Sequence, residues 1–107
     1  MIIARAHEEL EKAFHAINMA ERGEGGYIEK AIRHSLSAVA LTLGAEKSDE
    51  ILLSLPVLPP NLWGEVLRLI EINRLASIGV AGLDEAREAV EIAVAMYDFI
   101  VIGKGLE

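Results

Sequence analysis

The stretch that decides the fold is GLDEAREAVEIAVAMYDFIVI, residues 82–102. After a glycine and an acidic first turn, its apolar residues recur at steps of three and four, the period of an amphipathic α-helix. The residues of the apolar face are Ala86, Ala89, Val90, Ala93, Met96, Tyr97 and Ile100. We therefore predict a last helix over Asp84–Ile102, although FIVI at 99–102 also has β propensity.

Three further stretches of the chain have the same helical period. We predict helices over Ile3–Arg22, Tyr27–Leu43 and Asn61–Ser77, with Phe14 on the apolar face of the first. The run GEGG at 23–26 ends the first helix, because glycine readily adopts the left-handed conformation found after a helix. Asn61 has the side chain of an N-cap residue and is expected to begin its helix.

A proline-rich connection precedes the helix at Asn61. Ser48 is expected to cap a short helix over Ile51–Leu55. The stretch PVLPP at 56–60 is predicted to be extended, because proline lacks an N–H donor and restricts the residue before it. It is too short to separate domains. The expected fold is all-α, an up-and-down bundle of four to five helices, four long and one short, in a single domain over residues 1–107.

Composition excludes several classes of protein. The absence of cysteine excludes disulfides, thiolate zinc sites and cysteine nucleophiles. Ten basic residues against 17 acidic ones give a net charge of −7, and such an acidic chain repels nucleic acid. We find no phosphate-binding loop and no dinucleotide-binding glycine pattern, so no cofactor is expected.

The apolar runs and the start of the chain indicate its location. No run reaches the roughly 18 residues that a membrane helix needs, and charge appears from Arg5 onward, so neither a membrane span nor a signal peptide is expected. We expect a cytoplasmic protein. Three Asn and no Gln also match the composition of heat-adapted proteins.

Two segments resemble the HEPN superfamily of small helical bundles and its archaeal relatives. The segment MAERGEGGYIEKAIRHSLSAVALTLGA, at 19–45, is similar to two antiparallel helices that these proteins join by a short turn with a glycine and an aromatic residue. The segment GLDEAREAVEIAVAMYDFI, at 82–100, is similar to their last helix. HEPN-like proteins are typically dimeric, so the resemblance implies a dimer of helical bundles.

The HEPN ribonuclease motif is an Arg followed, after four to six intervening residues, by a His. Arg74 stands at a similar place, but the positions where His would follow are Gly79, Val80 and Ala81. The resemblance therefore implies that this member has lost the nuclease motif and acts without catalysis.

The three histidines are the side chains whose charge ordinarily changes near neutral pH. His15 and His34 fall on the polar sides of the first two predicted helices, and we interpret them as solvated or interface residues. His7 is expected at the core boundary with a hydrogen-bond partner. An alternative function is RNA cleavage at an unconventional site that uses Arg74 with His15 or His34.

Two carboxylate pairs open a second alternative. Glu8 with Glu11, and Glu88 with Glu91, each place two carboxylates on one helix face. This is similar to the all-α nucleotide pyrophosphatases, which hold Mg²⁺ with an ExxE and an ExxD motif. Here the second motif is ExxE, and both pairs lie opposite the apolar faces. A solvated charged surface is the interpretation that we prefer, and no metal is expected.

Several apolar residues fall on helix faces that should be exposed to solvent. They are Met19, Leu41, Trp63, Phe99 and Ile102. The second half of the second helix, SLSAVALTLGA at 35–45, is also apolar or small nearly all round, as in a central helix or one shared with a second subunit. These features favour contact with another protein, and a symmetric homodimer is the commonest arrangement. From the sequence we expect an uncharacterised HEPN-like protein that acts through protein contacts as a homodimer.

Overall fold

The computed structural model describes residues 2–45 and 47–103 and confirms the all-α fold. The four long helices are α1 (Ile2–Glu21), α2 (Tyr27–Thr42), α3 (Trp63–Ser77) and α4 (Leu83–Tyr97). The connection between α2 and α3 holds two 3₁₀ helices, η1 (Ser48–Val57) and η2 (Pro60–Leu62), and a π-helical segment η3 (Asp98–Ile102) follows α4. No β-strand occurs within these described ranges. The predicted bundle is therefore correct in class and in element order.

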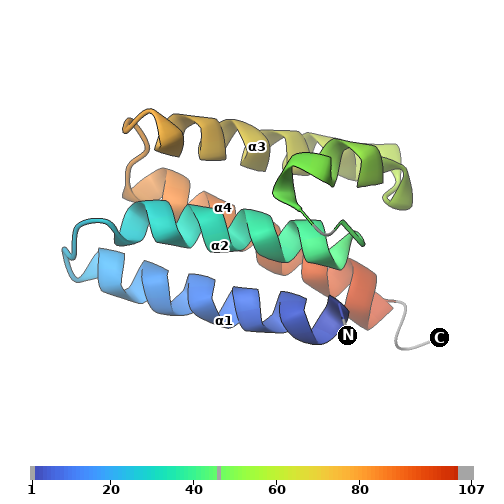
Figure 1. Cartoon of the computed structure of the whole chain (residues 1–107), viewed down its shortest axis with the longest axis horizontal. Coiled ribbons are helices and arrows are strands. Elements are labelled where there is room, and N and C mark those ends of the chain that lie inside the picture. Colours follow the sequence, from blue (N-terminus) through green and yellow to red (C-terminus); the bar gives the residue numbers. More distant parts are fainter. Residues whose placement is uncertain (1, 46, 104–107) are drawn as a thin grey trace.

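The long helices run up and down along the long axis of the molecule, as Figure 1 shows. The molecule measures 41 × 22 × 21 Å along its principal axes. α2 and α4 each pack against all three of the other long helices, and α1 and α3 lie on either side of this pair. The apolar half of α2 is buried, which makes α2 a central helix of a single chain.

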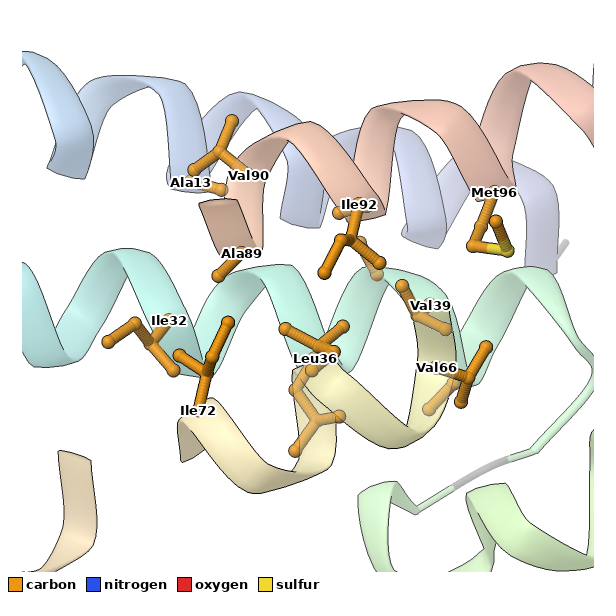
Figure 2. Close-up of a cluster of buried hydrophobic side chains, with 14 of the residues drawn as sticks. Ala13, Ile32, Leu36, Val39, Val66, Ile72, Ala89, Val90, Ile92 and Met96 are labelled. Atoms are coloured by element: carbon orange, nitrogen blue, oxygen red, sulfur yellow. The ribbon is translucent and has the colours of Figure 1, made fainter. Parts of the chain in front are cut away.

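The core is built where the apolar faces of the long helices meet. Figure 2 shows Ile32 and Leu36 of α2 beside Ile72 of α3, with Ala89 and Ile92 of α4 on the other side of α2. Ile32 and Ile72 are completely inaccessible to solvent. Alanines at core positions of α1, α2 and α4 let the helix backbones approach closely, because their side chains are short. The position of the α1–α2 pair is thereby fixed by apolar packing.

Three predictions about the connection between α2 and α3 are wrong. Ser48 does not cap the short helix, because η1 begins at Ser48 itself and the capping position is Lys47. Asn61 does not cap α3, because the chain enters α3 through the 3₁₀ turn η2, and no side chain caps the helix at Leu62. Pro56 is not extended but lies inside η1. Its fixed φ angle is close to that of a 3₁₀ helix, and only Leu58 and Pro59 have extended backbone.

Two details of the predicted helices also differ. Phe14 is 43% exposed, because α1 turns a face rich in alanine toward its neighbours and Phe14 lies beside that face. The last helix does not continue regularly to Ile102, since its hydrogen bonds change to the π pattern at Asp98. The segment FIVI is therefore helical and does not form a strand. In the part of the chain that is described, no helix is both long and apolar enough to cross a membrane.

Candidate functional site

A groove of about 570 Å³ lies between α1 and α2. Its α1 wall carries Glu8, Glu11, Lys12 and His15. Its α2 wall carries Tyr27, Lys30 and His34. The structure thus brings two of the predicted residues, His15 and His34, to one hollow, together with two lysines that the sequence did not single out.

The sequence places these side chains in two rows. On α2 the lining positions are three to four residues apart, and on α1 they recur at Glu8, Glu11–Lys12 and His15–Ala16 with the same period, so each row occupies one face of its helix. The short turn at 22–26 makes the helices antiparallel neighbours. Gly26, with φ of 84°, supplies the left-handed residue directly before α2. Residues of the two helices therefore meet across the groove, as His15 and Tyr27 do.

His34 is held by Glu9, a residue of α1 that does not line the groove itself. The Nδ1 atom of His34 lies 3.0 Å from Glu9 Oε1, and Lys12 Nζ lies 3.1 Å from Glu9 Oε2. A carboxylate only accepts hydrogen bonds, so Nδ1 of His34 carries the proton and Nε2 is left for another partner. The side chains of His34 and Glu9 are 28% and 18% exposed. This contact supplies the orienting partner that a functional histidine needs.

The pKa of Glu9 reflects this arrangement. Burial by itself would raise the pKa of the Glu9 carboxyl, but the hydrogen bonds from His34 and Lys12 outweigh burial and hold the pKa below its usual value. Glu9 is therefore ionised at neutral pH, and its charge is met by donors from both helices.

The other end of the groove is aromatic. The rings of His15 and Tyr27 meet edge to face with centroids 6.1 Å apart. The ammonium group of Lys30 lies 4.6 Å from the centroid of the Tyr27 ring, a cation–π distance. The ring of Tyr27 thus contacts both His15 and Lys30.

A smaller hollow of about 300 Å³ adjoins the groove and shares Glu8 and Lys12 with it. Arg5, Glu9, Ser37 and Leu41 also line it. Leu41 is only 5% exposed, so the prediction that it lies on a wet face is wrong. The all-round apolar half of α2 explains the error, because α2 is covered by three neighbouring helices.

Arg74 is placed elsewhere. Its Nε and Nη2 atoms donate to the two carboxylate oxygens of Glu71 at 3.1 and 2.6 Å, near the end of α3. The hydrogen bonds from Arg74 lower the pKa of Glu71. Arg74 does not line the groove that holds His15 and His34. The structure therefore does not assemble the arginine–histidine combination of the RNA-cleavage hypothesis.

The four carboxylates of the Mg²⁺ hypothesis are also not assembled. Glu88 forms a two-bond ion pair with Arg68, at 2.8 and 3.0 Å, which lowers the pKa of Glu88. Glu8 and Glu11 line the groove instead. Among residues 2–45 and 47–103, no group of three or more His, Cys, Asp or Glu could hold a metal ion. Glu91 is exposed on α4.

His7 is exposed rather than at the core boundary. Its Nε2 atom is 3.8 Å from a carboxylate oxygen of Glu11, and 59% of its side chain is exposed. Its ring centroid lies 6.1 Å from that of Tyr97 on α4. The predicted position of His7 at the core boundary is wrong because the core face of α1 passes through Ala6 and Leu10.

The remaining interface candidates differ in exposure. Phe99 and Ile102 are exposed as expected, at 46% and 51%. Met19 and Trp63 are partly buried, and Trp63 Nε1 donates to the Leu58 carbonyl at 3.0 Å. The sequence reasoning missed further exposed apolar residues. Leu67, Ile78 and Val80 are on or after α3, and three others lie on η1. The three on η1 are Leu52, Leu53 and Val57.

The sequence reasoning also missed Glu9, Lys12, Lys30 and Tyr27. Distance from the turn gave no signal for Glu9, because Glu9 lies 13 residues before the turn at 22–26 and His34 lies eight residues after it. No protein family, curated protein or solved structure matches this chain. The resemblance to HEPN proteins thus rests on the two sequence segments alone.

Proposed function

We propose that the protein is a non-catalytic, HEPN-like helical module that acts through protein contacts as a homodimer. The observation that carries this proposal is the apolar surface of η1. Leu52, Leu53 and Val57 are 54%, 83% and 47% exposed within one ten-residue element. Monomeric proteins seldom leave a large contiguous apolar patch in water, and such patches commonly mark interaction sites.

A second apolar group supports a symmetric arrangement. Phe99 and Ile102 project from η3, and η1 and η3 lie at the same end of the bundle, the end that also holds the N-terminus of α1 (Figure 1). A twofold axis at this end would bring both apolar groups of one copy onto a second copy. Such self-complementary pairing is the commonest form of soluble oligomer.

The charge distribution favours a second copy at this surface. Each chain carries a net charge of −7, so two copies repel wherever acidic surfaces meet. The stretch from Ile51 to Leu62 contains no charged residue, and only Asp49 and Glu50 precede it in η1. Contact through η1 therefore buries apolar area where the repulsion between copies is smallest.

Light scattering coupled to size exclusion tests the proposal. We expect a particle of twice the 11.6 kDa chain mass across micromolar concentrations. Added salt should preserve the dimer, because an apolar contact is not screened by salt and the repulsion between copies is. A particle with the mass of one chain over this whole range would contradict the proposal.

RNA cleavage is a second candidate function, favoured by the shared groove of His15 and His34. It requires one imidazole to accept a proton and the other to donate one. Incubation with structured and unstructured RNA tests it, with His15→Ala and His34→Ala beside the exposed control His7→Ala. Cleavage that survives in both groove variants, or that is absent from the unchanged protein, removes this candidate.

A further inference from the structure

We propose that the groove between α1 and α2 binds the phosphate group of a small phosphorylated molecule. Its donors come from opposite walls. Lys12 and His15 belong to α1, and Lys30 and His34 belong to α2. An ion that enters the groove therefore meets ammonium and imidazole groups on both sides. This site is independent of the apolar surface proposed for the dimer.

The donors differ in how far they are already engaged. Lys12 and His34 both contact Glu9, so these three side chains form a cluster within the protein. Lys30 contacts an aromatic ring and, within the described part of the chain, forms no ion pair with a carboxylate. Lys30 is therefore the cation best able to take an external anion. The Nε2 atom of His34, which Glu9 leaves unused, becomes the second donor when the imidazole is protonated.

Opposing charges make binding depend on protonation of the histidines. Glu8 and Glu11 line the groove from α1, and Glu9, which lines the adjoining hollow, contacts Lys12 and His34 of the groove. With neutral imidazoles these three carboxylates outnumber Lys12 and Lys30. Protonation of His15 and His34 reverses that balance and adds N–H donors. The groove should therefore take up a proton when it takes up the anion.

The donor types favour phosphate over a metal ion or a flat carboxylate. Charged ammonium groups cannot ligate a cation and would repel it. Lysine binds phosphate as a point charge, and the three terminal oxygens of a phosphate monoester can accept bonds from several directions at once. A carboxylate has two oxygens in one plane and is best matched by an arginine. Donors on two facing helices therefore suit the tetrahedral group.

Titration with inorganic phosphate, followed by NMR of the imidazole C–H signals, tests this proposal at constant ionic strength. At about pH 6 we expect the His15 and His34 signals to move and to saturate, and the exposed His7 signal to stay. At about pH 8 we expect binding to be about tenfold weaker, even though phosphate itself carries more charge there. The extra charge on phosphate would by itself strengthen binding, so weaker binding at about pH 8 must come from a change in the protein.

Two matched lysine variants locate the site. Lys30→Gln should weaken phosphate binding about tenfold, as expected for loss of one charge-assisted contact. Lys47→Gln, which removes an exposed lysine outside the groove, should leave it unchanged. If phosphate moves neither groove histidine, or if Lys30→Gln binds phosphate as the unchanged protein does, the proposal is overturned.

Dimethyl phosphate distinguishes a phosphate monoester from the diester of a nucleic acid. Two of its oxygens are blocked by methyl groups, so it offers fewer terminal oxygens to the donors, and we expect it to bind more weakly than inorganic phosphate at about pH 6. Equal or tighter binding of dimethyl phosphate would overturn the proposal of a small phosphomonoester. These measurements do not depend on the oligomeric state, so failure here and failure of the dimer proposal are separate results.

Discussion

His34 on α2 and Glu9 on α1 share a hydrogen bond of 3.0 Å between Nδ1 and Oε1. The two residues are 25 positions apart in the sequence and meet because the helices are antiparallel. Lys12 completes the contact from the α1 side. This cluster ties α1 to α2 beside the groove, and Glu9 engages only one nitrogen of the imidazole.

Glu9→Gln is expected to lower the free energy of unfolding by about 1 kcal/mol at neutral pH, because the amide loses charge-assisted hydrogen bonds at a partly exposed site. The pKa of Glu9 is lowered in the folded protein. Its contribution is therefore present above the ordinary carboxyl range and is lost as the pH falls through the lowered value. Urea denaturation at neutral pH and at about pH 3 measures how far Glu9→Gln lowers the free energy of unfolding at each pH.

The control for Glu9 is Glu24→Gln, which changes an exposed carboxylate in the turn between α1 and α2. It should alter stability little at either pH. A Glu9→Gln difference of the same size at both pH values would contradict the assignment of a charged contact.

Ile32→Ala is expected to destabilise the protein by about 2–5 kcal/mol, because Ile32 is completely buried and the truncation leaves a cavity. Ile78→Ala removes the same atoms from a side chain that is 60% exposed, and its effect should stay within about 0.5 kcal/mol. Chemical denaturation of both variants measures their losses of unfolding free energy. Equal losses would show that α2 is not central to the core.

Gly26→Ala is expected to cost about 1–2 kcal/mol, because φ at Gly26 is 84° and a side chain is strained in that region. Gly25→Ala is the neighbouring control, since Gly25 lacks the positive φ and has open space where the methyl group would lie. Thermal unfolding of the two variants separates backbone strain from crowding. A neutral Gly26→Ala would mean that the turn can change its conformation at little cost.

Leu53→Ser is expected to raise the dissociation constant of the proposed dimer about tenfold or more, as truncation at an interface centre does. Leu53 is 83% exposed in the single chain, so the fold should be unaffected. Val80→Ser, at a 61% exposed residue between α3 and α4, is the control for general surface polarity. Sedimentation equilibrium measures both. A dimer that is equally stable in all three proteins would place its interface elsewhere.

The candidate site could be predicted only in part. The sequence singled out His15 and His34 through their chemistry, but the groove between them needed the register of α1 against α2. Arg74 illustrates the opposite case, because its place in the sequence suggested a role beside a histidine and the structure pairs it with Glu71. Spacing along one helix does not determine which side chain of another helix lies opposite.

The sequence by itself determined the four long helices and the glycine turn between α1 and α2. The three- and four-residue period sets which segments become helical, and the glycines at 23–26 end α1, because both effects depend on residues close together in the chain. The tertiary structure decided which apolar residues are covered. Leu41 is buried and Phe14 is exposed, since burial depends on the helices that pack around each position. It also decided that Glu9 meets His34, because that contact requires two helices to lie side by side in one register.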